Sequence, residues 1–133
     1  MVKQIILKFH LPVKTISVNH LYGHRGNRKY IKKEGRDLRK VIISTILRDI
    51  KGKEEEVCSI RGKKLFVQIQ VGDKWLLQDG VSVRRKDLSN IEKFLIDSVF
   101  EALDIDDKFI WRLYMEKIVS DTQYINVLLG VYN

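Results

Sequence analysis

The sequence predicts an α+β domain in which strands and helices follow one another in the order β-α-β-α-β-β. Four segments alternate apolar and polar residues, as strands do when one of their faces is buried. Two longer segments repeat apolar residues at three- and four-residue steps, as amphipathic helices do. We therefore expect a single domain over residues 1–133, with a mixed sheet and both helices packed on one face of it.

The first third of the chain is expected to hold a strand, a loop and a helix. Residues 4–11 alternate in the strand pattern, and Pro12 ends that strand because proline cannot donate to a sheet. Residues 15–33 contain two glycines and no clean period, which indicates an exposed loop. Apolar residues then recur at helical spacing from about residue 34 to 51, and Gly52 suits the end of a helix.

The middle of the chain is expected to be a connector, a strand and a second loop. Residues 52–63 are polar and indicate a connector. Residues 65–71 alternate in the strand pattern. The glycine-bearing loop 72–86 then leads into the second helix.

The second helix is the best defined element. Asp87 suits its N-cap, because a carboxylate there accepts from backbone N–H groups and faces the positive end of the helix. Apolar positions follow at about 100° per residue as far as Leu103. Alternating segments at 109–115 and 125–131, with a Ser-Asp turn between them, predict the last two strands.

Composition indicates a soluble, basic, intracellular protein. Its 25 lysines and arginines against 17 aspartates and glutamates give a net charge of +8, which suggests an anionic partner such as nucleic acid. No apolar run approaches the roughly 20 residues needed to cross a bilayer. Lysines interrupt the first segment, so it does not resemble a signal peptide, and the single cysteine, Cys58, excludes an internal disulfide. We expect a cytoplasmic protein with no membrane partner.

The basic residues gather in two clusters, and both are candidates for contacts with nucleic acid. The first cluster consists of Arg25, Arg28, Lys29, Lys32 and Lys33. The second consists of Arg84, Arg85 and Lys86, immediately before Asp87. For any one of these residues, a phosphate contact and a solvated loop remain equally open.

Acidic residues stand at the ends of predicted elements, where they are free to converge in space. Asp87 opens the second helix, and Asp106 and Asp107 precede a strand. Carboxylates held close repel one another unless a cation lies between them, and Mg²⁺ prefers such hard oxygen ligands. Lys93 lies about one and a half turns beyond Asp87, from which its long side chain can contact phosphate.

A purely structural interpretation is also open. Asp87 would then be only an N-cap, and the two neighbouring aspartates only a turn. Lys93 and Asp97 have the i,i+4 spacing of an ion pair on a solvated helix face. On spacing alone this interpretation is favoured, because acidic caps and turns are frequent.

Starting at Asp87, the chain carries the motif D-x-S-N-x-x-K, then an acidic residue, then D-D and a lysine ten residues after the second of these aspartates. This motif resembles that of the RusA family of Holliday-junction resolvases. The matching residues are Asp87, Ser89, Asn90, Lys93, Asp97, Asp106, Asp107 and Lys117. Upstream, similar positions are Ser17, Val18, Asn19, Tyr22, Gly26, Arg28, Tyr30 and Gly35. The resemblance covers most of residues 17–117, has fixed gaps, and implies a RusA-like fold.

The resemblance implies a small homodimeric endodeoxyribonuclease that binds four-way DNA junctions and nicks paired strands with Mg²⁺ or Mn²⁺. Carried over by position, Asp87 and Asp107 would be the metal-binding catalytic carboxylates. Asp106 would be an accessory acid at the same metal site, and Lys93 the active-site lysine. Asn90 would orient the helix start or a ligand carboxylate. Asn19, within the upstream match, would join the two basic clusters in contacting DNA.

Ser89 is a departure from some members of that family, which have a third aspartate at this position. Serine is neutral and a weaker ligand, so the site carries less negative charge. Besides the nuclease, two other functions therefore remain open. One is a catalytically weakened or inactive protein that binds branched DNA or RNA, and the other is a structural dimer with incidental charge.

Overall fold

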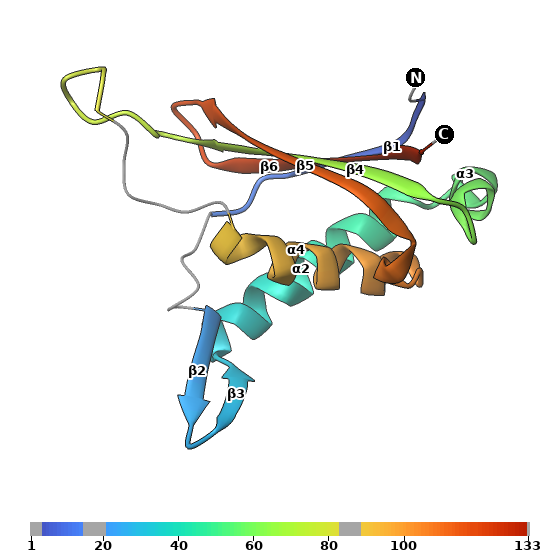
Figure 1. The fold of residues 1–133 in the computed structure, drawn as a ribbon, viewed down its shortest axis with the longest axis horizontal. Coiled ribbons are helices and arrows are strands. Elements are labelled where there is room, and N and C mark those ends of the chain that lie inside the picture. Colours follow the sequence, from blue (N-terminus) through green and yellow to red (C-terminus); the bar gives the residue numbers. More distant parts are fainter. Residues whose placement is uncertain (1–3, 15–20, 83–88, 133) are drawn as a thin grey trace.

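The computed structural model describes residues 4–14, 21–82 and 89–132, without the side chains of Ser89 and Asn90. A twisted four-stranded sheet forms one layer, and two long helices lie against one of its faces (Figure 1). The α+β class and the packing of the helices on one face are confirmed.

The sheet is mixed, as predicted. Its strands are β1 (Gln4–Leu11), β4 (Leu65–Asp73), β5 (Ile110–Val119) and β6 (Tyr124–Val131). Their order across the sheet is β1-β6-β4-β5. Only the β4–β5 pair is parallel, because a helix connects these two strands and returns the chain to the same end of the sheet.

Both predicted long helices are present, as α2 (Lys33–Asp49) and α4 (Ser89–Leu103). The prediction of a polar connector over 52–63 is wrong, because this segment contains the short helix α3 (Glu54–Ile60). Three glutamates fill the first turn of α3, where they suit the helix dipole, and Val57 and Ile60 are buried beneath it.

The acidic pair 106–107 was predicted to lead directly into a strand, but it does not. Asp107–Phe109 form a 3-10 helix, η1, and β5 begins one residue later. Trp111 of β5 is 61% exposed and therefore lies outside the core.

The predicted loop 15–33 contains a β-hairpin, which corrects that part of the prediction. Its strands are β2 (Tyr22–Arg25) and β3 (Arg28–Ile31), joined by two residues with Gly26 at a φ of 62°. Residues 15–20 lie outside the described part of the chain. The pattern was missed because six of the eight strand residues are charged, aromatic or histidine and most are exposed, so no apolar alternation marks them.

This hairpin, which we call the hairpin arm, projects from the start of α2 (Figure 1). Three contacts attach its base to that helix. The Arg36 Nη1 donates to the Ile31 carbonyl at 2.8 Å, and the Lys32 N–H donates to the Leu21 carbonyl at 2.8 Å. Gly35 allows the closest approach, because a Cβ there would lie 2.6 Å from the Leu21 carbonyl oxygen.

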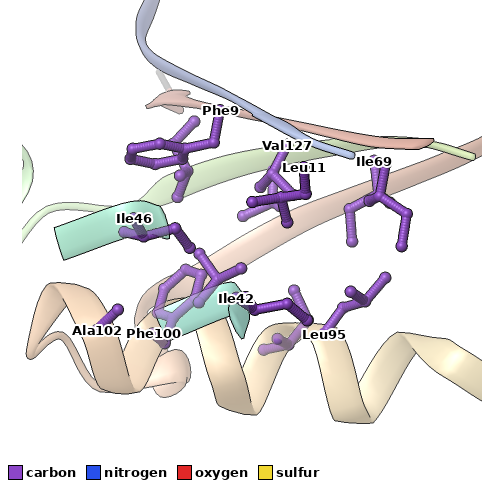
Figure 2. Packing of buried hydrophobic residues seen from close by; sticks show 14 of the residues in the cluster. Phe9, Leu11, Ile42, Ile46, Ile69, Leu95, Phe100, Ala102 and Val127 are labelled. Atoms are coloured by element: carbon purple, nitrogen blue, oxygen red, sulfur yellow. The ribbon is translucent and has the colours of Figure 1, made fainter. Parts of the chain in front are cut away.

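The core lies between the sheet and the two long helices (Figure 2). It is built from fully buried side chains of every layer, and burying each contributes about 1.5–3 kcal/mol. The largest contributors include Phe9 and Leu11 of β1, Ile42 and Ile46 of α2, Ile69 of β4 and Leu95 of α4. The predicted apolar face of α4 is therefore confirmed.

The opposite face of the sheet carries a chain of polar side chains across all four strands. His10 Nδ1 lies 2.7 Å from Asn126 Oδ1, and Asn126 Nδ2 donates to Gln70 Oε1 at 3.2 Å. Gln70 Nε2 donates to Glu116 Oε1 at 2.8 Å. These bonds link β1, β6, β4 and β5 in their spatial order and so favour one register.

We expect Gly35→Ala to destabilise the protein. In an unconstrained helix this change stabilises by about 0.5–1 kcal/mol, but here the methyl group would overlap the Leu21 carbonyl. We expect a net loss of about 1 kcal/mol or more, measured by urea denaturation. Ser44→Ala, at an exposed position of the same helix, is the matched control and is expected to be neutral or mildly stabilising. A gain of stability in Gly35→Ala would contradict the close packing of the arm.

Candidate active site

Lys93 and Asp107 face the same open pocket between α4 and β5, which we call the β5 pocket. Its volume is about 540 Å³. It lies at the edge of the sheet, because β5 is the outermost strand. The pocket is lined by Glu92, Lys93, Ile96, Asp97, Asp107, Ile110, Trp111 and Leu113.

A second pocket, which we call the Arg39 pocket, adjoins the first. Its volume is about 470 Å³. It is lined by Arg39, Asp97, Phe100, Glu101, Asp104, Ile105, Asp106 and Asp107. Asp97 and Asp107 line both pockets, so these two residues lie where the pockets meet.

The polar stripe of α4 supplies one wall of this region. Lys93, Asp97 and Glu101 are four residues apart, so they lie one above another along the helix. Arg39 of α2 donates to Glu101 Oε2 from Nη2 at 2.6 Å and from Nε at 2.9 Å. This ion pair joins the two helices and partly neutralises Glu101.

The two neighbouring aspartates have different surroundings. Asp106 Oδ1 accepts a hydrogen bond from the Lys108 N–H at 2.9 Å and thereby caps η1. The structural interpretation therefore holds for one oxygen of Asp106. Asp107 is exposed, and its carboxylate has no hydrogen bond or ion pair with any residue that the structure describes.

Tyr22 links the hairpin arm to this region. Its ring packs edge-on against Phe94 of α4, with centroids 6.1 Å apart, and Lys29 Nζ lies 4.1 Å from the ring centroid. Burial raises the pKa of the Tyr22 phenol, and the negative charge of Asp97 raises it further. The sequence motif marked Tyr22, but only the fold shows that it lies near Asp97.

Several predicted site residues lie outside the part of the chain that the structure describes. These are Asn19, Arg84, Arg85, Lys86 and Asp87. Asn90 lies in the first turn of α4, without a described side chain. Of the first basic cluster, every member is exposed, and the cluster is carried by the hairpin arm and the start of α2: Arg25, Arg28, Lys29, Lys32 and Lys33.

Asp87 and Asp107, which were expected to converge, stand before and after α4 in the chain. This helix has 15 residues, which corresponds to about 21 Å from first to last at 1.5 Å per residue. Asp87 precedes its first residue by two positions, and Asp107 follows its last by four. Asp87 lies outside the described residues, so its convergence with Asp107 stays a prediction.

The donor chemistry of the shared pocket wall fits a small divalent cation. Asp97 and Asp107 offer hard carboxylate oxygens beside open solvent, and Mg²⁺ retains several waters when it binds so few protein ligands. No group of three or more histidine, cysteine, aspartate or glutamate side chains that could hold a metal occurs within 4–14, 21–82 and 89–132. Asp97 and Asp107 are therefore the two acidic residues that the described part of the chain offers to a cation at this wall.

Sequence reasoning did not select Asp97 as a site residue and did not consider Arg39. Two signals were available for Asp97. One was its place in the family motif, and the other was its i,i+4 spacing with Lys93, which indicated an ion pair on a solvated face. Arg39 had no signal, because its approach to Glu101 depends on how α2 crosses α4.

We expect Asp97→Asn to lower the pKa of Tyr22 in metal-free protein, because it removes one of the two causes of the upward shift. Burial remains, so the pKa should stay above its ordinary value. Because the pKa of Tyr22 is raised in the folded protein, the neutral phenol contributes to the free energy of unfolding below pH 10. That contribution is lost as the pH rises through the raised pKa. Titration of tyrosine ring carbons by NMR measures the change, with Asp104→Asn as control. An unchanged Tyr22 titration would show that Asp97 does not act on it.

Comparison with known proteins gives one family match. A family model described as Endodeoxyribonuclease RusA matches residues 12–129. No curated protein matches the chain. Among the described residues, no helix is long and apolar enough to cross a membrane.

Proposed function

Because this chain belongs to the RusA family of endodeoxyribonucleases, we propose that it is a metal-dependent nuclease that resolves Holliday junctions by paired nicking. We further propose that it acts as a homodimer in cytoplasmic DNA recombination and repair. The observation that carries this proposal is the β5 pocket, in which Asp107 and Lys93 face the same open space.

We assign Asp107 and Asp87 as metal-binding catalytic residues, with Mg²⁺ or Mn²⁺ as the cation. When bound, such an ion makes a water molecule a better nucleophile and offsets charge that develops on the phosphate. Asp107 suits this role because it lines both pockets and its carboxylate has no hydrogen bond or ion pair with the described residues. Asp106 uses one oxygen to cap η1, so we assign it as the accessory acid that fixes the backbone beside Asp107.

Lys93 has the position and length to contact a phosphate at the same pocket. Its side chain is exposed, and an ammonium on four methylenes acts there as a mobile point charge. Asn90 precedes it by three residues in the first turn of α4. We assign Lys93 to the scissile phosphate and Asn90 to orienting groups at the start of the helix.

The hairpin arm and the start of α2 form the proposed DNA-binding surface. Their cationic residues are exposed, and the backbone of the hairpin arm extends from the helix layer (Figure 1), which suits contacts with phosphates on more than one strand. Such contacts position DNA without reading its sequence, as recognition of a junction by its shape requires. Arg84, Arg85, Lys86 and Asn19 complete this surface in our proposal.

Two arguments support a homodimer. Paired nicks in a symmetric junction require two active sites related by a two-fold axis. The first residue of α4 also lies about 21 Å from its last, so a second copy offers a route by which the start of one α4 approaches the Asp107 of its partner.

A second function is favoured by Ser89. If two carboxylates bind metal too weakly, the protein binds branched DNA or RNA without cleaving it. Incubation of a synthetic four-way junction with and without Mn²⁺ distinguishes the two functions. Salt-sensitive binding with no metal-dependent nicks would favour the binding protein.

We expect Asp107→Asn to abolish nicking of a four-way junction while binding is retained or tightened. The amide has similar size but no charge, so metal binding is lost and repulsion of the DNA backbone decreases. Asp87→Asn should behave in the same way. Product mapping on sequencing gels measures cleavage, and gel shift without metal measures binding.

Asp104→Asn is the control for both variants, because Asp104 lies in the Arg39 pocket but not in the β5 pocket. Asparagine also tolerates its positive φ of 55°. Retained cleavage in Asp107→Asn would contradict its assignment.

We expect the double variant Arg25→Gln and Arg28→Gln to weaken binding to every DNA shape. If both residues contact phosphates, the slope of log K against log salt should fall by about 2, or about 0.9 for each contact. Fluorescence anisotropy across a salt series measures this slope.

Lys51→Gln with Lys53→Gln makes the same change in charge at exposed positions beyond the opposite end of α2. Its slope should stay near that of the parent protein. If the slope falls by the same amount in both double variants, net charge, and not the hairpin arm, determines binding.

A further inference from the structure

We propose that Asp97 is a metal-binding residue that acts together with Asp107. This inference rests on the proposed metal dependence of the site. It assigns to Asp97 a role different from that of a solvated helix residue, and it makes the wall between the two pockets the place at which the cation is held.

The first support is position. Asp97 and Asp107 are the two residues that line both the β5 pocket and the Arg39 pocket. They come from different elements, α4 and η1, which contact each other. One acidic residue of each element therefore lines the same space, with Lys93 one helical turn from Asp97 in the same pocket.

The second support is charge compensation along α4. Glu101, one turn further, is held by two hydrogen bonds from Arg39. Asp97 is half-buried, and among the described residues its carboxylate has no hydrogen bond or ion pair. Arg39 is thus engaged by Glu101, and Asp97 has no ion pair with any residue that the structure describes.

Two acidic residues that line the same pockets, neither in an ion pair among the described residues, favour a bound cation. Partial burial increases this tendency, because a charge removed from water gains more from an opposite charge nearby. The β5 pocket, at about 540 Å³, also has room for an ion with its remaining waters.

The other acidic residues nearby fit this role less well. Asp106 is engaged in capping η1, and Glu101 is paired with Arg39. Asp104 lines the Arg39 pocket alone, and Glu92 lines the β5 pocket alone. Asp97 is therefore the partner of Asp107 that the geometry selects.

The test is Mn²⁺ binding to the full chain, measured by isothermal titration calorimetry and by electron paramagnetic resonance of free Mn²⁺. Neither readout depends on cleavage. We expect Asp97→Asn to weaken Mn²⁺ binding at least tenfold. Asp97→Glu keeps the carboxylate in a pocket with room for one more methylene. Its Mn²⁺ affinity should therefore stay within about fivefold of the parent, short of the tenfold loss, about 1.4 kcal/mol, expected for Asp97→Asn.

Asp104→Asn makes the same chemical change next to the site and should bind Mn²⁺ like the parent. Thermal melting of metal-free protein shows whether Asp97→Asn still folds. Parental Mn²⁺ affinity in folded Asp97→Asn would overturn the inference, and so would equal losses in Asp97→Asn and Asp97→Glu. If Asp97→Asn does not fold, the comparison of Asp97→Glu with Asp97→Ser decides in the same way.

Junction cleavage separates this inference from the proposed function. If the parent nicks junctions with Mn²⁺ and Asp97→Asn binds the ion normally, only the inference fails. If the parent binds Mn²⁺ through Asp97 but cuts no junction, the inference stands and the proposed nuclease activity fails. A parent that neither binds Mn²⁺ nor cuts overturns both.

Discussion

Burial of one face of α4 against the sheet and α2 is the interaction on which the rest of the structure depends. Leu95, Val99 and Leu103 are each about 1% exposed, so the helix cannot rotate about its axis without exposing them. The opposite stripe is thereby fixed toward β5 and η1. The orientation of Lys93 and Asp97 is thus a consequence of hydrophobic packing on the other side of the same helix.

Electrostatic contacts refine what packing establishes. Arg39 and Glu101 join α2 to α4 at 2.6 Å, yet both side chains keep contact with water, so the pair contributes little to stability. The larger consequence of this ion pair is that it partly neutralises Glu101 and leaves Asp97, one turn away on the stripe, without an ion pair among the described residues. The hairpin arm depends on the same helix pair, since Gly35 and Arg36 attach it to α2 while Tyr22 touches α4.

The differences between sequence-based expectation and structure have identifiable physical causes. The hairpin was missed because Arg25, Arg28 and their neighbours are exposed on both faces, and a strand with no buried face has no apolar alternation. The short helix α3 was missed because seven residues are too few to show helical periodicity. Asp106 was expected at a strand start, whereas it caps a turn of 3-10 helix, which the same Asp-Asp dipeptide permits equally well.

By itself the sequence determined the α+β class, the two long helices, the sheet strands and the motif that places the chain in its family. Those features depend on local periodicity and on the spacing of side chains along one segment, and both can be read without knowing the fold. Only the tertiary structure decided that Asp97 shares two pockets with Asp107, that Arg39 is engaged by Glu101, and that the first basic cluster projects on an arm. Each of these depends on how separate elements cross, and that is set by core packing between residues far apart in the chain.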